Sequence, residues 1–163
     1  DPNRFQLDND GPWHQEVHEF GLNYRLNDFQ CALGISQLAK LNQFKEIRRG
    51  IFNGYIEEFN DSVQIDTIEI KKDVDPMWHL FPIRVPEEKR RRIFTHLRQN
   101  SIGVQVNYIP AYWHPSFQKR GYTKGLCPKS EKFYSQEISL PMHINLKLSD
   151  IAHISSLVKS LLN

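Results

Sequence analysis

A chain of 163 residues, of which 39% are hydrophobic and 25% charged, has the composition of one ordinary globular domain. The net charge of +2 arises from interspersed acidic and basic residues, which gives no support to a nucleic-acid-binding or membrane-surface protein, since both need a basic face. No apolar run approaches the roughly 18 residues of a transmembrane helix. The two cysteines do not form a disulfide framework, so we expect a cytoplasmic protein with no membrane contact.

The amino-terminal segment, residues 1–26, is rich in Pro, Gly and acidic residues and lacks a sustained apolar period, which is typical of an extended arm. It starts at Asp1 without a Met, which we interpret as the sign of a fragment or a processed chain. Asn27 then has the spacing of a capping box, and no proline interrupts the helical pattern that follows. The sequence predicts one long helix over residues 27–59.

The apolar face of this predicted helix changes along its length. At 100° per residue, the apolar side chains of the second half form one stripe, made of Leu41, Phe44, Ile47, Ile51, Tyr55 and Phe59. Those of the first half point to the opposite side, namely Cys31, Ala32, Ile35 and Leu38. A helix whose halves bury different faces packs against two bodies, and only the second half has a partner in the downstream sequence.

Residues 60–163 alternate between short strands and helices, which predicts a small α/β layer domain. Strands are expected at 78–85, 104–109 and 137–140, with short β-like pieces at 63–65 and 68–70. Pro82 indicates that the first of these strands lies at a sheet edge or contains a bulge. Helices are expected at 86–99, at 129–135, and from an N-cap at Ser149 to the end of the chain.

Two patterns resemble known motifs without matching them. His14 and His18 have the spacing of two metal ligands on a helix, but Glu16 is out of place for a metalloprotease and no third ligand is evident, so surface histidines are the better interpretation. The run EEKRRR, residues 87–92, lies behind two acids on a predicted helix, which is more typical of a solvated face than of a nucleic-acid site.

Two short stretches are candidates for ligand binding. In NYIPAYWHP, prolines stiffen an aromatic and polar loop just after a predicted strand, where ligands often bind in α/β folds, but from the residues alone a loop whose rings cover the core is the better interpretation. The triplet Asn23, Tyr24 and Arg25 precedes a helix start, where amide donors and a guanidinium can hold a phosphate. As a motif by itself, this triplet is weak.

The stretch GLNYRLNDFQCALGISQLAKL resembles the signature of the DegT/DnrJ/StrS family of sugar aminotransferases, which are pyridoxal-phosphate enzymes. The matching positions are Gly21, Asn23, Arg25, Ala32, Gln37, Leu38 and Leu41. The segment 78–109 and the EISLPMH stretch also resemble the carboxy-terminal part of this family. The fold that the resemblance implies is the α/β small domain of an aspartate-aminotransferase-type (fold type I) transferase, with a long interdomain helix.

The resemblance implies a definite domain organisation. Residues 1–26 would be an arm and active-site loop that belong to a missing large domain, 27–59 the interdomain helix, and 60–163 the small domain. The lysine that binds the cofactor covalently would lie upstream, because no lysine here has the Ser-x-x-Lys context followed by Gly-Glu-Gly-Gly that the family resemblance implies. The chain is therefore expected to be inactive alone and to depend on the large domain and on a second subunit of a homodimer.

The resemblance also implies roles for particular residues. Asn23 and Arg25 would bind the phosphate of pyridoxal 5′-phosphate in the neighbouring subunit, although Arg25 could instead meet the donor's carboxylate or the substrate's diphosphate. Substrate contacts are implied for Tyr24, Arg25, Tyr108, Tyr112 and His114. Many family members have Tyr-x-Pro-x-His, whereas here Tyr112 holds the histidine position and His114 follows two residues later.

The implied reaction transfers an amino group from glutamate to a 4-keto nucleotide sugar. The stretches GPW, residues 11–13, and YIPAY, residues 108–112, resemble one subgroup of these transaminases. The competing hypothesis is a stand-alone, non-catalytic module that uses the exposed half of the helix to dimerise or to bind a partner.

Overall fold

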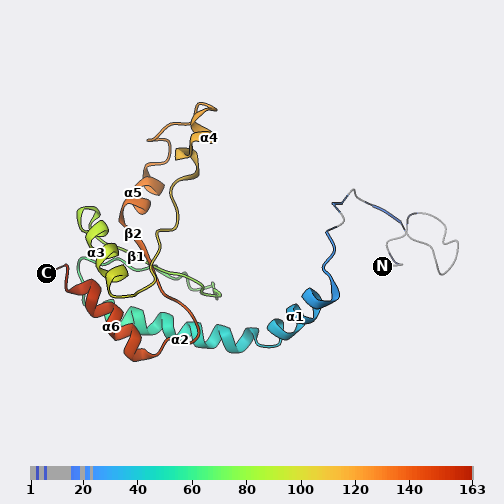
Figure 1. The fold of residues 1–163 in the computed structure, drawn as a ribbon, viewed down its shortest axis with the longest axis horizontal. Coiled ribbons are helices and arrows are strands. Elements are labelled where there is room, and N and C mark those ends of the chain that lie inside the picture. The colour runs from blue at the N-terminus through green and yellow to red at the C-terminus, as the bar shows by residue number, and fades with distance from the viewer. Residues whose placement is uncertain (1–2, 4–5, 7–15, 19–20, 23, 163) are drawn as a thin grey trace. The chain divides into compact units, whose positions relative to one another are not determined.

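The computed structural model describes residues 3, 6, 16–18, 21–22 and 24–162, in two compact units formed by residues 1–39 and 40–163 (Figure 1). Asn23, His14 and most of the predicted arm lie outside the described residues. None of the helices in the described ranges combines the length and the apolar character needed to span a bilayer.

The predicted helix over 27–59 is two helices, α1 (Asp28–Leu38) and α2 (Leu41–Phe59), so its expected continuity was wrong. Ala39 and Lys40 form a turn between them, and Lys40 has φ −98° and ψ −2°, at the margin of the helical region. The break falls just before Leu41, the position at which the apolar stripe changes sides. A lack of proline permits a continuous helix but does not enforce one, because a helix in a protein is stabilised mostly by tertiary packing rather than by local propensity.

Helix α1 begins as the sequence predicts and leaves its apolar side chains exposed. The Asn27 side chain accepts from the Gln30 amide at 2.8 Å, and the Gln30 side chain accepts from the Asn27 amide at 3.0 Å, which completes the capping box. No residue of α1 is buried, and Phe29, Ile35 and Leu38 are 80%, 70% and 69% exposed. The unpartnered apolar first half of the predicted helix is therefore present in the structure.

The sheet of the second unit is smaller than predicted. Strands β1 (Phe81–Arg84) and β2 (Glu137–Leu140) pair antiparallel, with Arg84 opposite Glu137. Beyond them only single bridges form, from Asp66 to Arg84 and from Gln105 to Ser139. The strand expected at 104–109 was thus wrong, as were those at 63–65 and 68–70, because alternation alone does not supply a partner along the whole segment.

Pro82 lies on the outer edge of β1, as predicted. The Arg84 amide donates to Asp66, on the side away from β2, and residues two apart along a strand direct their N–H groups to the same side. The nitrogen of Pro82, which has no hydrogen to donate, therefore faces away from β2.

Helices α3 (Glu87–Gln99) and α5 (Pro128–Gln136) contact the strands, and α6 (Leu148–Lys159) packs against α2 and α3. The short helix α4 (Pro115–Gln118) and a 3₁₀ turn at Ala111–Trp113 belong to a segment that projects away from the sheet (Figure 1). Helix α6 starts earlier than predicted, because the Lys147 amide donates to the Asp150 carboxylate at 2.9 Å, and Ser149 lies inside the first turn. Helices α3 and α5 match their predicted ranges closely.

The core of the second unit joins α2, both strands, α3 and α6. Its fully buried side chains include Tyr55, Phe81, Ile83, Ile93, Leu97, Ile138, Leu140, Ile151 and Val158. The Tyr55 ring stacks on Phe81 with centroids 4.6 Å apart, and its hydroxyl donates to the Pro141 carbonyl at 3.1 Å. The predicted stripe on α2 is buried from Ile51 onward, whereas Leu41 is 45% exposed.

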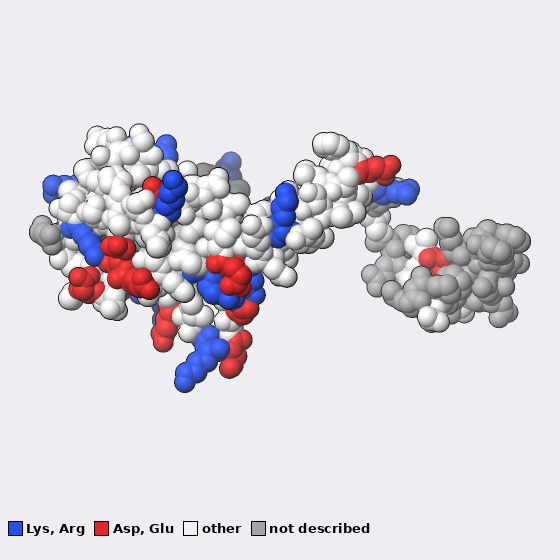
Figure 2. Space-filling view, turned by 90° about the horizontal axis from the view of Figure 1, so that it is seen from below, with Lys and Arg blue, Asp and Glu red and all other residues white. Residues whose placement is uncertain are grey.

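Basic residues of the 87–92 run stabilise the fold. The Lys89 ammonium donates to the Leu162 carbonyl at 2.7 Å, and the Arg90 guanidinium donates to the Tyr134 carbonyl at 3.2 Å and lies over the Tyr134 ring. On the face shown in Figure 2, Lys and Arg alternate with Asp and Glu rather than forming a continuous basic area. The prediction of a solvated helix face therefore holds for Arg91 and Arg92, which are exposed, but not for the half-buried Lys89 and Arg90.

Candidate functional site

The segment before α1 presents a free guanidinium. Tyr24 is 90% exposed, Arg25 is exposed, and Arg25 forms no ion pair with the described residues. The first turn of α1 is already capped by Asn27. The cap engages the Asn27 and Gln30 amides, and the Arg25 fork beside this turn suits a phosphate group.

The predicted substrate residues in the loop after Gln105 differ in the exposure of their side chains. Tyr108 is 75% exposed and His114 is exposed, so both side chains are accessible. Tyr112 is half-buried, and its hydroxyl donates to the Glu131 carboxylate at 2.6 Å. The two interpretations of this loop thus apply to different residues: Tyr108 and His114 are available to a ligand, while Tyr112 packs inward.

Glu131, on α5, organises the inward part of this loop. One carboxylate oxygen accepts from the Tyr112 hydroxyl, from the Trp113 indole at 3.2 Å and from the Gly125 amide at 2.6 Å. The Tyr112 hydroxyl also accepts from the Cys127 amide at 3.2 Å. The sequence prediction missed Glu131, whose only local signal is a carboxylate in the first turn after Pro128.

The protonation of this cluster is consistent with its geometry. The hydrogen bond from Tyr112 lowers the pKa of Glu131 below its usual range, assisted by the Gly125 amide. Desolvation, followed by the hydrogen bond to Glu131, raises the pKa of Tyr112 to about 12. The ionised carboxylate and the neutral phenol are therefore the favoured forms at neutral pH.

Replacing Glu131 by alanine is expected to loosen the loop between Tyr112 and Cys127. Trypsin cleavage at Lys119, Arg120 and Lys124 should become about tenfold faster, because three donors lose one charged acceptor.

In the parent chain the stabilising effect of Glu131 is present above the ordinary glutamate pKa and is lost as pH falls through the lowered pKa of Glu131. Cleavage of the loop should therefore also accelerate in acid.

The control for this loop is Glu88→Ala, which removes an exposed carboxylate from α3. Its cleavage pattern, followed by mass spectrometry with a protease suited to each pH, should match that of the parent chain. Equal cleavage rates in Glu131→Ala and the parent would contradict the organising role of Glu131.

A second polar cluster lies at the base of the same loop. Glu137 is fully buried at the start of β2, where its carboxylate accepts from the Asn107 amide at 2.7 Å and from the Ser139 hydroxyl at 2.5 Å. The Asn107 side chain donates to the Ser139 hydroxyl at 3.0 Å. Burial is the largest influence on the pKa of Glu137 and raises it, against the opposing effects of these hydrogen bonds and of the Arg90 charge.

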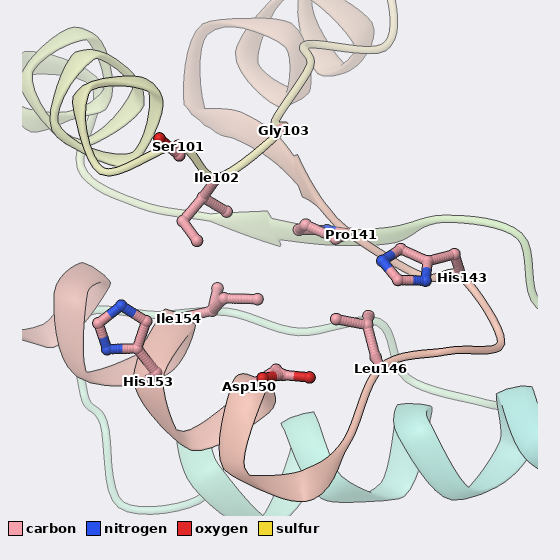
Figure 3. Close-up of a pocket in the computed structure, with 9 residues that line it drawn as sticks. All are labelled: Ser101, Ile102, Gly103, Pro141, His143, Leu146, Asp150, His153 and Ile154. Carbon is pink, nitrogen blue, oxygen red and sulfur yellow. The ribbon is translucent and has the colours of Figure 1, made fainter.

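A separate hollow of about 390 Å³ lies elsewhere in the second unit. Figure 3 shows Ile102, Leu146 and Ile154 around it, with the rings of His143 and His153 at its sides. None of the predicted site residues lines it. In the described part of the chain no group of three or more His, Cys, Asp or Glu side chains is arranged to hold a metal ion, and His14 lies outside that part.

The exposed apolar helix, the Arg25 segment and the aromatic loop occur in a chain that belongs to the DegT/DnrJ/EryC1/StrS aminotransferase family, whose model matches residues 5–159. A UDP-4-amino-4,6-dideoxy-N-acetyl-beta-L-altrosamine transaminase of Campylobacter jejuni is 37% identical over 153 residues, which cover 92% of this chain and 40% of that protein. The predicted family and the subgroup resemblance are confirmed by these matches.

Solved structures show the same fold. Helicobacter pylori PseC, an aminotransferase involved in the biosynthesis of pseudoaminic acid, matches with a TM-score of 0.80 and 30% identity over 94% of this chain and 42% of its own. A sugar aminotransferase of Streptococcus pneumoniae in its PMP form matches with a TM-score of 0.78 and 26% identity over 83% of this chain and 35% of its own. The expected fold class is confirmed, and the chain spans about 40% of the length of the relatives it matches.

Proposed function

We propose that this chain is the carboxy-terminal part of a cytoplasmic, pyridoxal-phosphate-dependent aminotransferase that transfers an amino group from glutamate to a 4-keto nucleotide sugar. The observation that carries the proposal is the family match over residues 5–159, together with relatives that act on amino sugars. The free Arg25 guanidinium and the accessible Tyr108 side chain support it, because they offer an anion contact and an aromatic surface.

The domain organisation belongs to the same proposal. Residues 1–26 would complete a large domain, residues 27–59 would join it to the small domain, and 60–163 would form the small domain itself. The exposed apolar side chains of α1 support this division, since a helix with Phe29, Ile35 and Leu38 in water is the kind of surface that another body covers. The large domain and a second subunit of a homodimer are the proposed partners.

Each candidate residue has a proposed task. Asn23 and Arg25 would hold the cofactor phosphate by donated hydrogen bonds, and the exposed guanidinium of Arg25 fits that anion. When bound, pyridoxal phosphate supplies the electron sink that amino-group transfer requires. Tyr24 would lie against the substrate beside Arg25.

Tyr108 and His114 would contact the nucleotide sugar directly. Tyr112, which the family resemblance also implicates, would act through its bond to Glu131 by fixing the course of the loop between them. Trp113 also contacts Tyr134 edge-to-face, with ring centroids 5.5 Å apart, which would help to fix the same turn.

The reaction is tested by comparing the full-length enzyme with the 163-residue chain. The full-length protein should aminate a UDP-linked 4-keto sugar with glutamate as donor, and the 163-residue chain should not. Incubation of the chain with pyridoxal phosphate should leave no absorbance band that survives dialysis, because the lysine expected to bind the cofactor is absent. A stable band, or turnover by the chain alone, would refute the proposal that this lysine lies upstream.

The second candidate, a stand-alone dimerisation module, also derives from the apolar side chains of α1. It predicts that the 163-residue chain sediments as a defined dimer and that Leu38→Glu converts it to a monomer. The aminotransferase proposal predicts instead that the catalytic activity of the full-length enzyme requires the rest of the protein, whatever the association state of the chain.

A further inference from the structure

We propose that Glu137 is a positioning residue: its buried carboxylate fixes the main chain at Asn107 and thereby sets the course of the substrate loop, residues 108–114. The inference rests on the proposed function, because it assigns this loop to the nucleotide sugar. No contact between Glu137 and the substrate is implied.

The carboxylate is buried and both of its oxygens have partners. Glu137 has no exposed surface, one oxygen accepts from the Asn107 amide at 2.7 Å, and the other accepts from the Ser139 hydroxyl at 2.5 Å. A buried ionisable side chain without such bonds costs several kcal/mol. An apolar residue in its place would leave the Asn107 amide without this acceptor.

The contacts of Glu137 mark where the loop leaves the sheet. Gln105 exchanges two main-chain hydrogen bonds with Ser139, at 2.8 and 3.3 Å, and the Asn107 side chain donates to the Ser139 hydroxyl at 3.0 Å. The next two residues, Tyr108 and Ile109, are 75% and 38% exposed. Fixed backbone therefore ends at Asn107, one residue before the first proposed substrate contact.

The far end of the loop is held separately. Pro110 is buried, and Tyr112 is bonded to Glu131 on α5. The Tyr108 side chain thus projects from a short stretch fixed on both sides, and its direction depends on the Asn107 main chain. Loss of the Glu137 bond would release one of these two ends, and a misplaced contact residue weakens substrate binding without altering chemistry elsewhere.

The proposal is tested first in the 163-residue chain, by amide hydrogen exchange measured residue by residue with NMR. Glu137→Leu keeps side-chain bulk but offers no acceptor, so the Asn107 amide should exchange about tenfold faster or more, while amides of α6 keep their protection. Glu137→Gln retains one acceptor and should give a smaller change. Unchanged protection of Asn107 in Glu137→Leu would overturn the proposal.

The second arm uses the full-length enzyme and separates the two substrates. Glu137→Leu and Glu137→Ala should raise KM for the nucleotide sugar about tenfold, while the rate at which glutamate converts the cofactor, followed by absorbance, stays unchanged. An equal fall in both steps would show a merely structural role and overturn the proposal. Should both variants fail to fold, Glu137→Gln decides, with an expected rise of about threefold and a wild-type KM as the contradicting result.

The control is Glu88→Gln, an exposed carboxylate on α3, which should leave both substrates unaffected. Failure of the proposed function would give a different result from failure of the Glu137 proposal. The unaltered full-length enzyme would then not aminate a nucleotide sugar, whereas hydrogen exchange of the Asn107 amide would still report its bond to Glu137.

Discussion

Leu97→Ala is expected to lower the free energy of unfolding by about 2–5 kcal/mol. The side chain is fully buried on α3, in the core formed with β2 and α6, and its truncation removes apolar contacts and leaves a cavity. Urea denaturation of the 163-residue chain, followed by circular dichroism, measures the change.

Thr95→Ala is the matched control, because Thr95 lies on the same helix with its side chain exposed. A change within about 0.5 kcal/mol is expected there. A similarly small change in Leu97→Ala would contradict the packing of α3 against the sheet.

In the full-length enzyme, Arg25→Ala is expected to weaken cofactor retention about 10- to 100-fold, and Asn23→Ala should weaken it as well. The reason is that a hydrogen bond to a charged group contributes about 1.5–3 kcal/mol, and the exposed Arg25 guanidinium is the group proposed to bind the phosphate. Equilibrium dialysis against pyridoxal phosphate, monitored by absorbance, gives the dissociation constants.

Arg91→Ala removes an exposed arginine from α3 and should leave cofactor retention unchanged. If Arg25→Ala retains the cofactor normally but raises KM for glutamate or for the nucleotide sugar, Arg25 binds a substrate carboxylate or diphosphate instead. Unchanged affinity in Asn23→Ala would remove the phosphate role of that residue.

Elements with local start and stop signals were predictable from the sequence. Helix α3 follows Pro86 with two acids in its first turn, and β2 is followed directly by Pro141. The strand expected at 104–109 has the right alternation, yet only Gln105 forms a bridge. Strand pairing depends on a neighbour distant in sequence, and here that neighbour, β2, is short.

The prediction of one continuous helix over residues 27–59 was wrong for a related reason. The sequence shows where the apolar stripe changes sides, but the turn at Ala39 and Lys40 carries no Pro or Gly to signal it. In the structure the apolar side chains of α1 are exposed, whereas those of α2 are buried from Ile51 onward.

The hydrogen bonds of the loop with Tyr108, Tyr112 and His114 could not be predicted from the sequence. The sequence places these three residues on one loop, but it gives Glu131 and Glu137 only ordinary helix and strand positions. Glu131 is 19 residues from Tyr112, and Glu137 is 30 from Asn107. Because single polar side chains at such separations leave no periodic signal, their pairing with the loop emerges only from the fold.

Pro82 has a consequence for how this chain meets other molecules. An incoming extended peptide would find no amide at that position of the outer edge of β1, and the Arg84 amide and carbonyl are already taken by Asp66. Growth of a cross-β assembly through this edge is therefore disfavoured.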